Sequence, residues 1–465
     1  MARLRKIFLS LFLLSFVASC SSLKKSSRIY KTPEVETENL YRDVESTDST
    51  SFANVPWQQV FQDKVLQNLI NEGLSNNIDL QIVINRIKAA EARYGVAKMS
   101  LLPPLSLNAS ASETKLTDAD AAGAGDDTQE QYDVSLSTSW ELDIWGKLRS
   151  AKKAEYAALL ESDAYKRAVQ TRLIANVSNY YYSLLALDYK LAILEETVQN
   201  RIKSVETMGS LKDAGIVTGA AVVQSEASRY AAEIVIPDVQ QQIREIENAL
   251  SVLLGRNPGP IERTTFDDQN IPDYFETGIP SLLLSNRPDV QQAEYALRGA
   301  FEGTKQARTY FYPALTISAS AGYSNVKLDD LFRPGSVFAN VAAGLFQPIF
   351  NNGTNKARLE IAKVAQEEAL LNFYQTILTA GQEVSNALFA YDTAEKKAII
   401  REQQLKSLNN SVDFTKELLN SGKSNYLDVL TSEQSLLSAQ LNSIDDTLMK
   451  YQAVVNLYTA LGGGW

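Results

Sequence analysis

Two long stretches of this chain repeat one another, and this duplication limits the possible folds more than any other feature of the sequence. Residues 74–111 match residues 284–321 without a gap, with 12 identical positions in 38. Residues 211–255 match residues 418–462, with 11 identical positions in 45. The chain therefore consists of two copies of one unit of roughly 210 residues, a period far longer than that of a solenoid repeat.

Within each copy, the spacing of apolar residues changes from helical to strand-like and back. Residues 78–102 have helical spacing, and Pro103 and its counterpart Pro313 are expected to end the two equivalent helices. Two segments of alternating polarity follow in each copy, which predicts strands at about 104–113, 132–142, 314–323 and 336–346. Each has the length that a tilted strand needs to cross a bilayer. A soluble sandwich also contains alternating strands, so the pattern alone leaves both folds open.

Two longer segments have the composition of uninterrupted helices. Residues 147–212 and 355–421 contain no proline, which predicts helices of about 100 Å at 1.5 Å per residue. An apolar seam of coiled-coil spacing follows the first helix: Leu187, Leu191, Leu194, Val198, Ile202, Val205 and Met208. Each helix is expected to reverse at a glycine, Gly215 or Gly422, and to return antiparallel. Pro237 should kink or break the first return helix.

The absence of histidine removes several classes of function. Ser-His-Asp triads, Cys-His dyads and His-ligated metals all require an imidazole. The 45 Lys and Arg against 55 Asp and Glu give a net charge of −10, which disfavours nucleic acid as a partner. Beyond the N-terminus no stretch of 18 uninterrupted apolar residues occurs, so membrane contact of the body would have to come from strands.

The N-terminus has the pattern of a lipoprotein signal. A basic start precedes an apolar run from Ile7 to Ala18, as in secretory signals. Val17-Ala18-Ser19-Cys20 resembles the bacterial lipobox, which predicts lipidation of Cys20; a plain signal peptide with a chance cysteine is the alternative. Residues 21–56 are rich in Ser, Thr, Glu and Lys and are expected to form an extended tether.

These observations divide the chain into five parts. They are a signal peptide (1–19), a lipidated tether (20–56), a first repeat (57–255), a connector (256–280) and a second repeat (281–465).

Together these features resemble the TolC-like outer-membrane efflux proteins, specifically their lipoprotein branch (NodT-type, RND-type outer-membrane factors). The most specific motifs are Trp140–Arg149, Phe346–Gly353, Leu427–Leu430 and Leu457–Trp465. The resemblance implies a mainly α fold with transmembrane β: a homotrimer whose twelve strands close an outer-membrane β-barrel, continued by a long periplasmic α-helical barrel. It implies a channel, the exit duct of a tripartite efflux system with a periplasmic adaptor and an inner-membrane pump of the RND type.

The residues support the same mechanism independently. Four strands per chain are too few to close a barrel around water, whereas three chains supply an even, closed sheet without exposed edges. Polar strand faces would line a wet lumen, and Leu, Val, Ile and Ala would face outer-membrane lipid. Such a protein has no chemical step of its own, and its sole covalent group would be the lipid on Cys20.

Two tetrapeptides occupy equivalent positions at the far ends of the long helices: Gly215-Ile216-Val217-Thr218 and Gly422-Lys423-Ser424-Asn425. Glycine suits a helix-ending residue with positive φ. A trimer would carry six such turns at its periplasmic tip, where they are expected to dock the adaptor.

A periplasmic gate is expected just before these turns. Asp413 and Glu417 are four residues apart and share a helix face, and Asp213 offers a comparable position in the first copy. Three chains would repeat each acid as a ring that favours cations, closed by pairs with Lys416 or Lys212. The alternative is that these charges lie on a solvated helix face.

Two rival functions fit the sequence less well. A secreted enzyme with paired carboxylates, such as a glycosidase, would require clefts and irregular loops that a helical repeat lacks. A periplasmic coiled-coil scaffold with a small soluble sheet would leave the alternation of the strands unexplained.

Overall fold

The computed structural model describes residues 29–35, 40–42, 51–115, 117, 128–269 and 280–465. Residues 37–465 form one compact unit, distinct from residues 1–36, and only this unit is described below. The predicted signal peptide, Cys20 and most of the predicted tether lie outside the described residues.

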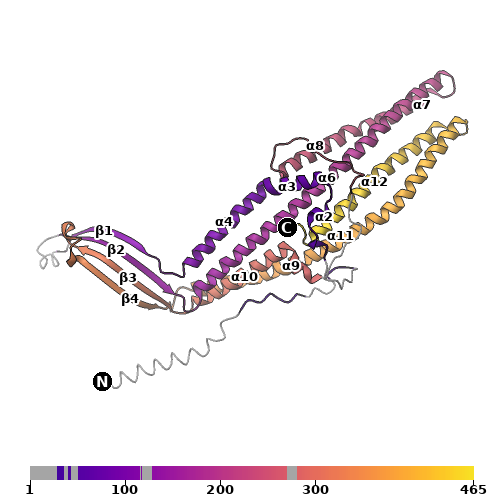
Figure 1. Ribbon diagram of the computed structural model, residues 1–465. Helices are drawn as coiled ribbons and strands as arrows, with labels where there is room; N and C mark the ends of the chain where they lie inside the picture. Colours follow the sequence, from indigo (N-terminus) through magenta and orange to yellow (C-terminus); the bar gives the residue numbers. More distant parts are fainter. Residues whose placement is uncertain (1–28, 36–39, 43–50, 116, 118–127, 270–279) are drawn as a thin grey trace. The chain divides into compact units, whose positions relative to one another are not determined.

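The two copies contain the same order of elements (Figure 1). The first copy contains α2 (Trp57–Val60), α3 (Lys64–Asn76), α4 (Ile78–Met99), β1 (Ser106–Lys115), β2 (Thr128–Leu142), α6 (Lys147–Asp213), α7 (Gly219–Glu233) and α8 (Val235–Leu253). The second copy contains α9 (Leu283–Asn286), α10 (Pro288–Thr309), β3 (Ala314–Asn325), β4 (Val337–Phe346), α11 (Thr354–Asn420) and α12 (Tyr426–Ala460). Short 3₁₀ turns lie at Phe52–Asn54, Pro280–Leu282, Leu328–Asp330 and Pro334–Ser336.

A pair of equivalent glycines shows how closely the copies correspond in space. Gly255 follows the last helix of the first copy with φ +70°, and Gly462 follows that of the second with φ +97°. A side chain on Gly255 would overlap the Asn76 carbonyl oxygen, and one on Gly462 would overlap the backbone of Asn286. Asn76 and Asn286 are themselves equivalent, so both copies close by the same approach of backbone to backbone.

The long helices are continuous, as their composition predicts. α6 and α11 contain 67 residues each, or about 100 Å at 1.5 Å per residue. The return helix after α11 is also continuous, whereas the one after α6 is divided at Ile234 into α7 and α8. The break lies one turn before Pro237, which has no N–H to bond the Glu233 carbonyl.

The core lies around the middle of α6, which contacts α3, α8 and α12. Tyr181 and Tyr182 of α6 are fully buried there, as is Tyr458 near the end of α12. The Tyr181 hydroxyl donates to Asp63 at 2.5 Å, and Asp63 also caps the first turn of α3. Burial alone would raise the pKa of Asp63, but hydrogen bonds from Thr264, Tyr181 and other donors together lower it, so the carboxylate remains charged.

The coiled-coil seam of α6 differs from the prediction at one position. Arg201 is buried, with 4% of its surface exposed, whereas Ile202 is half-buried. Alternating steps of three and four from Val198 lead to position 201, so the arginine follows the heptad spacing and the isoleucine does not.

Candidate functional site

The four strands form one antiparallel sheet in the order β1-β2-β3-β4. One face carries apolar rows that cross all four strands, for example Leu107, Leu136, Ala321 and Ala339 in paired register. The other face carries polar rows, for example Ser106, Ser137, Ser320 and Asn340. The predicted alternation therefore produces a sheet with one apolar and one polar surface.

The outer strands of this sheet are β1 and β4. The side chains of β1 are exposed along its whole length, and those of β4 along nearly all of it, on both faces. Since an outer strand leaves a row of backbone donors and acceptors without strand partners, both edges of the sheet are suited to pairing with another chain.

Aromatic residues mark the junction of the sheet with the helices. Trp145 donates from its indole to the Pro313 carbonyl at 2.7 Å and stacks on Tyr312. Trp140 donates to the Leu101 carbonyl at 3.2 Å. Phe346 and Phe350 instead expose their rings. The two tryptophans thus join β2 to the neighbouring helix–strand connections, while the two phenylalanines face outward.

The predicted tip residues lie at the reversals of the two hairpins (Figure 1). Gly215 and Gly422 have φ values of +74° and +71°, as expected for helix-ending glycines. Ile216, Thr218, Lys423 and Asn425 are exposed, and Val217 and Ser424 are partly exposed. The backbone of both turns agrees with the prediction; the docking role stays a prediction.

The gate candidates lie near the same reversals. Asp413 and Glu417 are exposed on α11, and Asp213 is the last residue of α6. Lys416 pairs with Glu433 of α12 at 2.9 Å, a partner on the return helix of its own hairpin.

Sequence reasoning missed a buried polar link between the two hairpins. Arg201 of α6 donates to the Ser228 carbonyl of α7 and, at 2.9 Å, to the Gln434 side chain of α12. Nearer the tips, the hydroxyls of Ser225 and Tyr426 are hydrogen-bonded at 2.9 Å in a buried position. Strict heptad spacing would have placed Arg201 on the seam, but a search for apolar residues passes over it.

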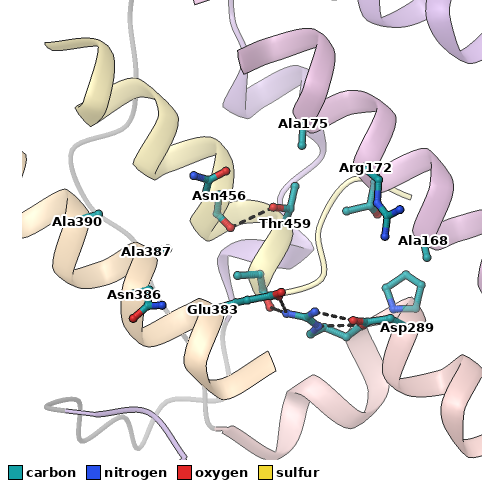
Figure 2. A pocket seen from close by; sticks show the side chains of 14 residues that line it. Ala168, Arg172, Ala175, Asp289, Glu383, Asn386, Ala387, Ala390, Asn456 and Thr459 are labelled. Atoms are coloured by element: carbon teal, nitrogen blue, oxygen red, sulfur yellow. Dashed lines mark hydrogen bonds and ion pairs between the residues drawn. The ribbon is translucent and has the colours of Figure 1, made fainter. Parts of the chain in front are cut away.

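A pocket of about 550 Å³ lies between the copies and is lined by α6, α10, α11 and α12 (Figure 2). Arg287 is buried beside it and pairs with Asp289 at 2.6 Å and with Glu383 at 2.7 Å. Burial alone would lower the pKa of Arg287, but these two carboxylates raise it. Both acids are bound to the guanidinium, which makes them poor candidates for the paired carboxylates of a glycosidase.

The described parts of the chain lack two features that would suggest other functions. They contain no group of three or more His, Cys, Asp or Glu side chains suited to hold a metal ion. None of the helices described combines the length and the apolar content that a bilayer span requires.

The geometry defines a class of protein: a duplicated channel subunit, with a two-faced sheet at one end and paired helical hairpins beyond it. Comparison with known proteins gives the family. Residues 69–256 and 279–463 match the family described as "Outer membrane efflux protein". Because this match covers most of the chain, the chain belongs to that family, and it is an efflux protein of the outer membrane.

Individual relatives extend along nearly the whole chain. "Probable outer membrane lipoprotein SilC" of Salmonella typhimurium is 30% identical, covering 98% of this chain and 98% of SilC. "Toluene efflux pump outer membrane protein TtgC" of Pseudomonas putida is 30% identical over 99% of this chain and 96% of its own. The solved open state of the MtrE outer membrane channel of Neisseria gonorrhoeae has a TM-score of 0.85 at 27% identity, covering 94% and 98% of the two chains. The predicted family is confirmed.

Proposed function

We propose that three copies of this chain assemble into a twelve-stranded outer-membrane barrel continued by a periplasmic tube of helices. The observation that carries this proposal is the four-stranded antiparallel sheet, with its exposed outer strands and its separate apolar and polar faces. In such a trimer, β4 of one chain pairs with β1 of the next, antiparallel like every other pair, and no edge remains. The apolar rows face lipid and the polar rows line the lumen.

In this proposal the channel is the exit duct of a tripartite efflux system and performs no chemical step. An inner-membrane pump of the RND type drives export, and a periplasmic adaptor joins the pump to the channel. Family membership supports this role, as do the two exposed turns at the ends of the hairpins. The pump is expected to choose the cargo, because a wide duct discriminates little among small solutes. The toluene in the name of TtgC belongs to that relative.

Two neighbouring residues of β4 test the assignment of the sheet faces. Val341 is on the apolar face and Asn340 on the polar face. Val341→Arg should disfavour membrane insertion by about 2–4 kcal/mol at mid-bilayer depth, whereas Asn340→Arg should be tolerated in a wet lumen. The readout is the yield of SDS-resistant trimer that dissociates on heating, with strand content followed by circular dichroism. Equal yields of the two variants, or a water-soluble wild-type monomer, would refute the barrel.

The lipid anchor is a separate part of the proposal. The lipobox supports attachment of lipid to Cys20 after removal of residues 1–19. Cys20→Ala should yield protein that lacks lipid or retains its signal, while the barrel still inserts through its own apolar face. Mass spectrometry of the mature N-terminus checks this, and an unmodified Cys20 in the wild type would exclude lipidation.

A further inference from the structure

The strand–helix junctions carry a concentration of positive charge that the acidic chain shows nowhere else so densely. Eight basic residues lie at the four helix ends that adjoin the sheet (Figure 1): Lys98, Lys147, Arg149, Lys152, Lys153, Arg308, Lys356 and Arg358. We call this set the basic collar. The first seven residues of α6 contain four of these cations and no acid, in a chain of net charge −10.

The position of these cations opposes the electrostatics of the helices themselves. A helix N-terminus carries partial positive charge and favours acids, and α4, α8, α10 and α12 each have an Asp in the first turn. α6 and α11 have no acid in the first turn and have basic residues there instead. Since both copies place cations where the helix disfavours them, intrahelical stability does not account for the collar.

Contacts within the chain use only part of this charge. Lys147 pairs with Glu141 at 2.8 Å, and Arg149 pairs with Asp143 at 2.9 Å. Lys147 and Arg358, one from each copy, also lie over the ring of Tyr310 at 4.8 and 4.0 Å from its centroid. Among the described residues, Lys152, Lys153 and Lys356 have no ion-pair partner.

Exposed apolar side chains lie directly beside the cations. Each of the four connections between a strand and a helix has at least one: Leu102, Ile144, Phe311, Ile349 and Phe350. Ile349 is 99% exposed and Phe350 is 83% exposed, a few residues before Lys356. Apolar side chains next to cations are the composition of a membrane interface, where the former reach the acyl chains and the latter reach phosphates.

We propose that the basic collar binds the headgroups of anionic phospholipids at the periplasmic face of the outer membrane. This proposal rests on the proposed function, because the collar lies at that face only if the sheet spans the bilayer. The bound class is a phosphodiester headgroup with net negative charge, such as phosphatidylglycerol, recognised by charge and by the flanking apolar anchors.

The test uses full-length protein in phosphatidylcholine vesicles that contain spin-labelled phosphatidylglycerol or spin-labelled phosphatidylcholine. Wild-type protein should select phosphatidylglycerol about threefold or more at its surface, since one Lys or Arg beside an anionic lipid shifts the equilibrium on the order of fivefold before screening. The selectivity should decline towards one in about 0.5 M salt. Wild-type protein without selectivity, or with selectivity that salt leaves unchanged, would overturn the collar.

Two triple variants locate the effect. Lys152→Gln, Lys153→Gln and Lys356→Gln together should reduce the selectivity to near one. The control removes the same charge at exposed positions outside the collar, Lys203→Gln, Arg244→Gln and Lys406→Gln, and should keep the wild-type value. Equal loss in both triples would overturn the collar. Bilayer conductance distinguishes the two levels: a protein that conducts without lipid selectivity refutes the collar alone, and one that fails to insert refutes the channel.

Discussion

The two helical hairpins share the same glycine turn but differ in the residues that start their return helices. After Gly422, Asn425 and Asp428 form a capping box in which each side chain accepts from the other's backbone N–H. After Gly215, the Thr218 side chain makes no capping hydrogen bond. The return helix of the second hairpin runs for 35 residues, and that of the first is divided at Ile234. The duplication has kept the reversal and allowed local stabilisation to diverge.

This difference indicates that the first hairpin depends more on its neighbour. Its return helix begins without a side-chain cap and is interrupted, and the buried links through Arg201 and Ser225 join it to α12. The second hairpin has its own cap and an uninterrupted helix. Substitutions in the two hairpins can test this asymmetry, from the largest expected effect to the smallest.

Charging both tips should abolish export. Val217→Arg and Ser424→Arg together place bulky cations on both reversals, where an adaptor would meet the channel end-on. Trimer yield and membrane insertion should stay normal, since both residues lie outside the core. The measurement is efflux by the assembled system, with each single variant showing whether one tip dominates.

The matched control moves the same charges along the same return helices. Val223→Arg and Ser435→Arg alter exposed residues one or more turns from the tips and should leave export intact. If export persists with both tips altered, the adaptor engages the tube elsewhere.

The Arg201 link should contribute more to stability than its apolar neighbour. Arg201→Ala leaves the Ser228 carbonyl and the Gln434 amide without their charged donor, at a cost of about 2 kcal/mol. Ile202→Ala, at a half-buried position, should cost about 1 kcal/mol. Denaturant titration of the two variants compares them, and a larger loss for Ile202→Ala would restore the apolar seam predicted from the sequence.

Local spacing made much of this architecture predictable, because the responsible interactions lie within one turn or one strand. The glycine reversals, the break before Pro237 and the alternation of Leu107 and Ser106 all result from such short-range constraints. Strand limits were less accurate. β2 begins at Thr128, four residues before the predicted start, because Gln129 and Glu130 pair with β1 through their backbones and carry no apolar pattern.

Contacts between distant residues were beyond the reach of periodicity. Arg287 and Glu383 meet only when the copies pack together, and nothing in the spacing of either residue indicates the other. Arg201 was passed over for a related reason: its partners lie on α7 and α12, and a charged residue gives no apolar signal. The family resemblance supplied the oligomeric and membrane context that single-chain patterns lack.

The acids before the two reversals should affect conduction unequally. The second hairpin carries Asp413 and Glu417, whereas the first carries Asp213 at its end. If trimer rings of these acids line a constriction, Asp413→Ala with Glu417→Ala should lower cation selectivity more than Asp213→Ala. Reversal potentials across a salt gradient measure this. Unchanged conductance and selectivity in the double variant would assign these charges to a solvated face.

The smallest expected effect separates the caps themselves. Asn425→Ala removes a side chain that accepts from the Asp428 N–H at 3.1 Å, so it should destabilise the second hairpin by about 1 kcal/mol. Thr218→Ala removes no capping bond and should change stability by about a few tenths of a kcal/mol at most. Amide hydrogen exchange in the first turns of α7 and α12 resolves the two sites separately, with protection lost in α12 alone. Equal loss of protection in both turns would mean that Thr218 caps α7 in solution and that the two tips are equivalent.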